Sequence, residues 1–209
     1  PQAHIGDMKM LMAVLTTAAL ATAACGSSPT AGPSPLAEAP PAGTLSATPW
    51  TMPAGLDPAY VRALVGYIDP AGRPKRWEGG PFHHCFGPGI DGARRDMLEG
   101  VADQMTRLSG VPRAAAGECN VTWRIAEKPE ENQPGAAANA DIGNEPQIYR
   151  VTITFRAAFL VALDVATHES GHALGLGHSP VRTDTMHANY PEGTFSANER
   201  AVLAWMYGR

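Results

Sequence analysis

The sequence lacks an excess of basic residues, and with it the usual signature of a nucleic-acid-binding protein. Its 209 residues contain 16 Lys and Arg against 20 Asp and Glu, which gives a formal net charge of −4 and a pI near 6.0. Nucleic-acid binding relies on a basic patch or stripe, so we expect no nucleic-acid partner. Arg73, Lys75 and Arg76 do cluster, and we interpret them as a solvated charge run.

A segment long enough to span a membrane is also lacking near the N-terminus. The apolar stretch from Met8 to Ala24 is shorter than the roughly 20 residues that cross a bilayer. It has one lysine, Lys9, near its start and ends in small residues before Cys25, which is typical of a secretory signal. Small residues followed by cysteine also resemble a bacterial lipoprotein signal, although Thr22 stands where Leu is usual. We therefore expect an exported cell-envelope protein that touches the membrane only through a lipid at Cys25, with plain secretion as the alternative.

Charges and large apolar side chains are scarce from residue 26 to about 53, where Ser, Pro, Ala, Gly and Thr dominate. Such a composition buries too little apolar surface to offset chain entropy, so we expect a disordered tether here. Asp57-Pro58 then predicts the start of a short helix to about Tyr67, because Asp is a favoured N-cap and Pro a favoured first residue. This helix is either a small lead-in or a vestigial pro-segment.

The chain thus divides into four expected parts. These are an upstream remnant at 1–7, a signal peptide at 8–25, the tether with its lead-in at 26–70, and one folded domain at 71–209. We expect this domain to be a monomer.

The hydrophobic pattern of the domain predicts an α+β fold. Apolar residues at spacings of three and four predict a helix over 91–109, closed by Gly110. Alternating patterns predict strands over 81–86, 121–125 and 148–155, with a short edge strand near 136–140. An apolar run from Phe159 leads into a helix that ends near Gly175, and Ser196 with Glu199 forms a capping box for a last helix.

Residues 168 to 178 carry the chemistry, and read His-Glu-Ser-Gly-His-Ala-Leu-Gly-Leu-Gly-His. On a helix, His168 and His172 lie on one face and can offer two imidazole nitrogens to one metal ion. Glu169 lies at the edge of that face, where a carboxylate can take a proton from a water that the metal activates. Gly175 lets the helix stop and the chain turn back, which brings His178 round as a third ligand.

Three neutral nitrogen ligands with an open fourth position are typical of a catalytic zinc site, since structural zinc sites are usually closed and rich in cysteine. A lone histidine on an apolar helix is more often a core residue. Packing alone does not produce three histidines and a glutamate at these offsets, and the eleven-residue motif is far more specific than its first five residues.

This motif resembles that of the metzincin zinc endopeptidases, and within them the matrixin-like branch. The resemblance implies His168, His172 and His178 as ligands of one catalytic Zn²⁺, Glu169 as general base, and a protein or peptide substrate. It also implies a methionine turn at Met186, eight residues after the third histidine. The α+β order of elements is similar to the metzincin core, and the resemblance is strong over 159–208, weaker over 75–158 and absent before.

Three departures accompany this resemblance. Tyr190 matches the matrixin tyrosine in the wall of the S1′ pocket, but Ala188 stands where the family has proline. The Asp- and His-rich loops of animal matrixins, which hold structural calcium and a second zinc, are missing between 127 and 158. Asp141 and Asp164 are too few to support Ca²⁺. A cysteine switch of the Pro-Arg-Cys-Gly kind is also missing, so latency of that type is not supported.

The three cysteines divide into Cys25 for lipid and Cys85 with Cys119 for a disulfide, as suits an exported protein. The competing interpretation is a metal cluster of His83, His84 and Cys85. Adjacent strand residues point to opposite faces, which disfavours one ion between the two histidines.

Two functions from different classes follow. The first is a zinc-dependent endopeptidase. The second is a non-catalytic cell-surface binding protein that keeps a metzincin shell, and the intact Glu169 argues against it because such a protein has no need of a base beside the metal.

Overall fold

The computed structural model describes residues 52, 54–66, 68–69, 72–128, 137–189 and 193–209. All of these belong to one unit within residues 46–209. The expectations for the signal segment, for most of the tether, for Cys25 and for Tyr190 lie outside the described residues. In chain order the elements are α1 (Pro58–Val65), β1 (His84–Phe86), α2 (Gly92–Ser109), β2 (Val121–Ile125), β3 (Ala138–Asp141), β4 (Val151–Phe155), the 3-10 helix η2 (Ala158–Leu160), α3 (Leu163–Ala173) and α4 (Ala197–Met206).

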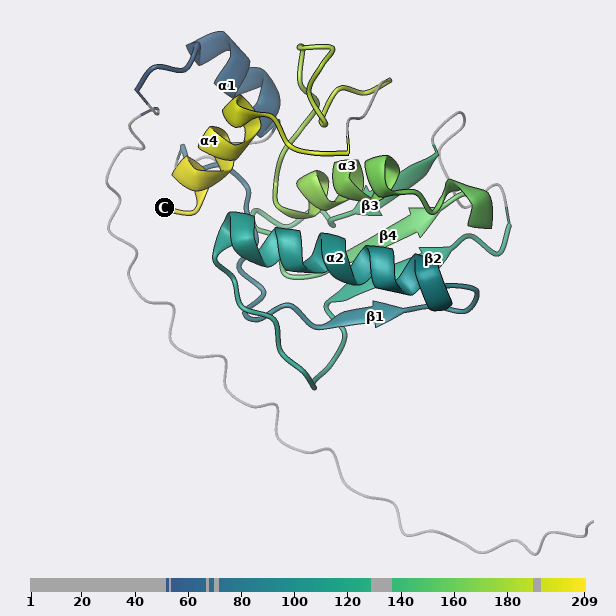
Figure 1. Ribbon diagram of the computed structural model, residues 1–209. Coiled ribbons are helices and arrows are strands. Elements are labelled where there is room, and N and C mark those ends of the chain that lie inside the picture. Colours follow the sequence, from purple (N-terminus) through teal and green to yellow (C-terminus); the bar gives the residue numbers. More distant parts are fainter. Residues whose placement is uncertain (1–51, 53, 67, 70–71, 129–136, 190–192) are drawn as a thin grey trace, which may run out of the picture. The chain divides into compact units, whose positions relative to one another are not determined.

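The four strands form one mixed sheet in the order β1-β2-β4-β3 (Figure 1). β1, β2 and β4 run parallel, and β3 is an antiparallel edge strand whose Ala140 lies opposite Ile153. One face is apolar and buried, with Trp123 and Ile153 fully covered, while Thr122, Thr152 and Thr154 line a polar hollow on the other. This mixed sheet with its helices confirms the α+β prediction.

Helix α2 follows from its sequence pattern. Leu98, Val101 and Met105 recur at helical spacing and are at most 1% exposed, and Gly110 ends the helix in the left-handed conformation. Helices α2 and α3 lie side by side along the sheet (Figure 1). Among the described residues, no helix is both long and apolar enough to cross a membrane.

Helix α1 begins as predicted, with the Asp57 side chain accepting a hydrogen bond from the Ala59 N–H at 2.9 Å. We expected this segment to precede the folded domain. In the structure, however, one side of α1 belongs to the same hydrophobic core as the sheet, through Tyr60, Val61, Leu64 and Val65.

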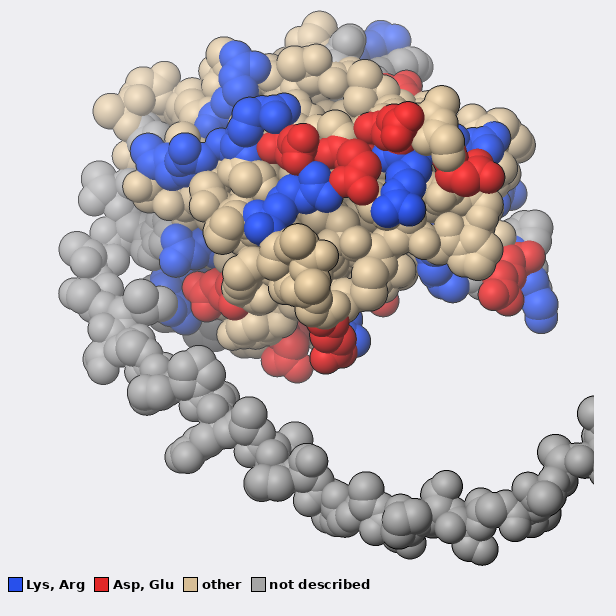
Figure 2. Space-filling model, turned by 60° about the horizontal axis from the view of Figure 1, so that its bottom comes forward, with Lys and Arg blue, Asp and Glu red and all other residues tan. Residues whose placement is uncertain are grey.

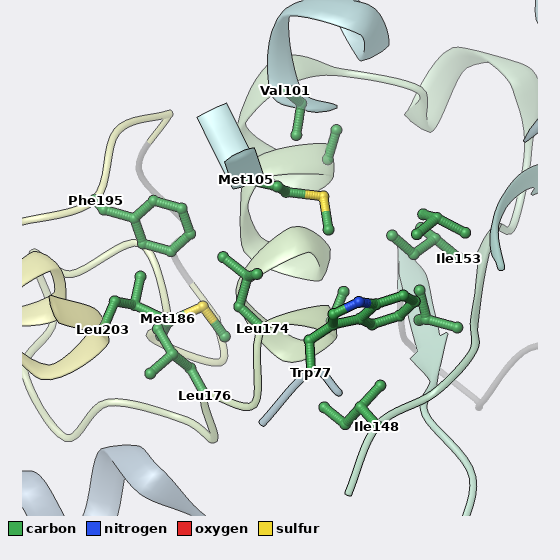
Figure 3. Close-up of a cluster of buried hydrophobic side chains, with 14 of the residues drawn as sticks. Trp77, Val101, Met105, Ile148, Ile153, Leu174, Leu176, Met186, Phe195 and Leu203 are labelled. Carbon is green, nitrogen blue, oxygen red and sulfur yellow. The ribbon is translucent and has the colours of Figure 1, made fainter. Parts of the chain in front are cut away.

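The core lies between the sheet and the helices and continues to α4. Figure 3 shows Trp77 and Ile148 in one part of this cluster, Met186, Phe195 and Leu203 in another, and Leu174 between them. On the surface, acidic and basic side chains are interspersed (Figure 2).

The prediction that the charged residues at 73–76 are solvated is wrong. Lys75 is only 6% exposed, and its Nζ donates to the Gly143 carbonyl at 2.8 Å. Arg76 donates from Nη1 to the Met206 carbonyl at 2.7 Å. The long apolar stems allow both side chains to cross the core boundary while their charged ends reach backbone carbonyls. The run therefore ties the start of the domain to the loop after β3 and to α4.

Cys85 and Cys119 form a disulfide with a Cα–Cα distance of 5.8 Å, which joins β1 to the segment that enters β2. The two neighbouring histidines diverge, as strand geometry requires. The His84 ring accepts a hydrogen bond from Trp123 Nε1 at 3.0 Å, whereas His83 packs against Gly117. Burial, reinforced by the positive charge of Arg113, lowers the pKa of His84 to about 4.

Candidate metal centre

Helix α3 and the loop after it bring the three predicted histidines together. His168 and His172 are one helical turn apart, and His178 follows the turn that ends the helix. One ligand atom from each ring lies within 4.8 Å of the others, and these three residues form the one such group of His, Cys, Asp and Glu in the described part of the chain. This spacing suits one shared metal ion.

Backbone carbonyls fix the orientation of two of the rings. His168 Nδ1 lies 2.7 Å from the Thr185 carbonyl oxygen, and His172 Nδ1 lies 2.8 Å from the Leu176 carbonyl oxygen. A carbonyl oxygen can only accept, so each Nδ1 carries the proton and each Nε2 keeps its lone pair for a metal. The hydrogen bonds thus select the tautomer that a zinc ligand needs.

The histidines are also held in the neutral form. Burial, with the other histidines nearby, lowers the pKa of His172 to about 4. Burial also lowers the pKa values of His168 and His178. Metal binding requires unprotonated imidazole, so the site is in its binding form at neutral pH.

Gly175 is required at the turn for two reasons. Its φ of +97° strains any residue with a Cβ, and a Cβ there would lie 2.0 Å from the Lys75 carbonyl oxygen. The helix end therefore packs directly on the backbone of the segment before β1, and the chain can reverse toward His178.

Glu169 directly follows the first histidine in α3. It is 5% exposed, and its Oε2 has no hydrogen-bond partner among the described residues. Burial raises its pKa to about 7, although a backbone hydrogen bond from Ala140 in β3 acts in the opposite direction. A carboxyl group with one unpartnered oxygen is suited to exchange a proton with a water or substrate at this place.

Met186 lies beneath the ligand helix. It is fully buried, and a Cβ added to Gly171 would lie 2.2 Å from its sulfur. Gly171 precedes His172 directly, so this glycine makes room for the thioether under the ligands. Figure 3 shows the Met186 side chain among Leu174, Leu176, Phe195 and Leu203.

The sequence did not predict that Glu199 supports the methionine turn, which contains Thr185 and Met186. We expected Glu199 only in the capping box of α4, which is present. The same carboxylate accepts the Met186 N–H at 2.7 Å and the Thr185 N–H at 3.3 Å. Since the Thr185 carbonyl holds His168, Glu199 supports a ligand through one intervening residue. No signal in the sequence spacing indicates this second role.

The comparisons with known proteins agree with this geometry. Residues 122–208 match the model of the family described as Matrixin, and no curated protein matches the chain. The matched range runs from β2 to the end of α4 and includes the three histidines, Glu169 and Met186. Residues 122–208 are therefore a matrixin-like metzincin domain, and the three-histidine group lies within this range.

Proposed function

We propose that this protein is a zinc-dependent endopeptidase in which His168, His172 and His178 hold one catalytic Zn²⁺ and Glu169 is the general base. One observation carries the proposal: the unpartnered Oε2 of Glu169 lies in a buried position on the helix that supplies two neutral ligands. A purely structural zinc site has no use for such a group.

A bound Zn²⁺ would supply a Lewis acid that polarises the scissile carbonyl and lowers the pKa of a water. The chain's own residues do the rest. The three imidazoles would hold the ion, and Glu169 would take a proton from the attacking water and later give it to the leaving amine. Its raised pKa suits both directions of proton transfer near neutral pH.

Strand β3 supports a peptide as the substrate class. It is an edge strand of the sheet, and it contacts α3, the ligand helix. An extended peptide can add to a sheet edge through main-chain hydrogen bonds, which fixes its backbone without specifying its side chains.

The test compares Glu169→Gln with Asp164→Asn, an exposed acid in the first turn of the same helix. Glu169→Gln should keep one zinc per chain and reduce kcat by orders of magnitude, because it removes only proton transfer. Asp164→Asn should cleave peptides like the parent. Parent-like turnover by Glu169→Gln would contradict the assigned role.

The non-catalytic binding protein remains the alternative, and no feature of the site favours it. A binding protein that kept the metzincin fold without catalysis would tolerate loss of Glu169. In this structure, however, the Glu169 carboxyl group is buried and is held by a backbone hydrogen bond from β3.

We also propose export with a lipid at Cys25, on the sequence alone. The chain made in a bacterium with its own signal should enter the detergent phase, and Cys25→Ser should stay in the aqueous phase. If both forms are aqueous and the mature N-terminus is not a modified Cys25, plain secretion is correct.

A further inference from the structure

Helix α1 makes a direct backbone contact with the residue before the third histidine. The Leu64 carbonyl accepts the Gly177 N–H at 2.6 Å. A Cβ on Gly66 would lie 3.0 Å from the Gly177 Cα, and a Cβ on Gly177 would lie 2.8 Å from the Gly66 Cα. Two glycines thus let the end of α1 touch the chain that leads to His178, with no side chain between them.

The same helix also holds the residue after the third histidine. Tyr60 OH donates to Asp184 Oδ2 at 2.6 Å, and Ser179 Oγ donates to the same oxygen at 2.6 Å. All three residues are at most 7% exposed. A buried carboxylate needs hydrogen-bond donors, so removal of the Tyr60 or the Ser179 hydroxyl should cause the Asp184 carboxylate and the remaining hydroxyl to rearrange.

This link extends to the methionine turn. The Ser179 N–H donates to the Met186 carbonyl at 2.9 Å, so the residue after His178 is paired with the residue beneath the ligand helix. Ser179 Oγ also accepts the Val181 N–H at 3.0 Å, which shapes the loop between them. Tyr60 therefore contacts, through Asp184, the loop that connects the third ligand to the floor of the site.

The third ligand has particular need of such support. His168 and His172 lie on a helix and have their rings oriented by carbonyls, whereas His178 lies in a loop and is exposed. The residues on either side of it are Gly177, which α1 contacts directly, and Ser179, which is linked to α1 through Asp184.

We propose that α1 is a positioning element for the third metal ligand, and not a removable pro-segment. Tyr60 and the Gly66–Gly177 contact hold the chain on both sides of His178, so that its imidazole faces the other two. Tyr60 is a positioning residue, because it acts through Asp184 and Ser179 and does not touch the metal position. The inference rests on the proposed zinc site but not on catalysis.

The experiment uses the full chain and three single variants. Tyr60→Phe removes one hydroxyl, and Gly66→Ala pushes the two backbones apart. Ser109→Ala is the matched control, since Ser109 is a buried residue whose hydroxyl bonds Met105 and Val111 at the end of α2. Zinc affinity is measured by competition with a chromophoric chelator, and ligand geometry by the visible absorption of the Co²⁺-substituted protein.

Tyr60→Phe and Gly66→Ala should each weaken zinc binding by roughly 10- to 100-fold, the range for residues that orient ligands. Their Co²⁺ spectra should change, and their peptidase activity should fall. Ser109→Ala should lower the melting temperature and keep the parent affinity and spectrum. Tyr60→Phe remains informative if Gly66→Ala does not fold, because it alters only one atom.

Two results would overturn the inference. Parent-like zinc affinity and spectra in Tyr60→Phe would show that α1 does not position His178. A rise in activity in that variant would identify α1 as an inhibitory segment. If the parent itself binds no zinc, the proposed function fails instead, and the two failures are thereby distinguished.

Discussion

Replacing Gly171 by alanine tests whether Met186 lies beneath the ligand helix. Gly171 is inside α3, where its own backbone conformation accepts any residue. A Cβ there would lie 2.2 Å from the Met186 sulfur and 3.1 Å from Phe195 Cε1. Both neighbours are at most 1% exposed, so neither can move aside into solvent.

Two effects of opposite sign decide the stability of this variant. Alanine in place of glycine inside a helix stabilises by about 1 kcal/mol. Inserting a methyl group into a filled core costs about 1–3 kcal/mol. The expected result for Gly171→Ala is therefore a net loss of up to about 2 kcal/mol of unfolding free energy. Zinc affinity should fall as well, since the displaced thioether lies in the turn that holds His168.

The control is Gly100→Ala in α2, where an added Cβ meets nothing within 4 Å. Urea unfolding of the zinc-free proteins should find this control more stable than the parent by about 1 kcal/mol. In the double variant Gly171→Ala with Met186→Val, the shorter side chain should relieve the clash, with a coupling above about 0.5 kcal/mol. If Gly171→Ala stabilises as much as Gly100→Ala does, the placement of Met186 is wrong.

Three further predictions concern stability and the site floor. The pKa of His84 is about 4 in the folded protein and near 6.5 in the unfolded chain, so its contribution of about 3 kcal/mol to stability is present above pH 6.5 and is lost as the pH falls toward 4. In urea titrations, His84→Gln, which can still accept the hydrogen bond from Trp123, should lose less stability than the parent between pH 7 and 4. The same pH dependence in both proteins would exclude His84 as the cause. Reduction of Cys85–Cys119, which are 34 residues apart, should destabilise by about 3–4 kcal/mol without loss of zinc; equal melting temperatures with and without reductant would refute this. Met186→Leu should cost below about 1.5 kcal/mol and keep the metal, whereas Met186→Glu should weaken zinc binding or activity 10- to 100-fold; parent-like affinity and turnover of the glutamate variant would exclude a role under the ligands.

Local signals account for the elements that the sequence predicted well. β2 has the predicted bounds, and α2 begins one residue later than predicted. Its apolar spacing and Gly110 act within the element, so neighbours in the chain suffice to specify it. Strands β1 and β4 are shorter than predicted, because Phe82 and Ile148 pair only in isolated bridges with Arg113 and Trp77.

Long-range contacts explain what the sequence did not reveal. The spacing from His168 to His178 is short enough to be recognised, and the structure brings those ligands together. Tyr60 and Asp184 are 124 residues apart, so no periodicity links them. The burial of Lys75 depends likewise on Gly143, which lies in a distant loop. Such positions are set by tertiary packing, which the pattern of a single segment does not contain.

The most direct test of the account is the metal content of the purified protein together with its peptide cleavage. Elemental analysis should find about one zinc per chain, and a chelator should remove both the metal and the activity, which added Zn²⁺ should restore. His178→Ala should lose the metal under the same conditions, because only two of the three imidazole ligands remain. A protein that holds no zinc, or that cleaves peptides equally well after chelation, would contradict the assignment.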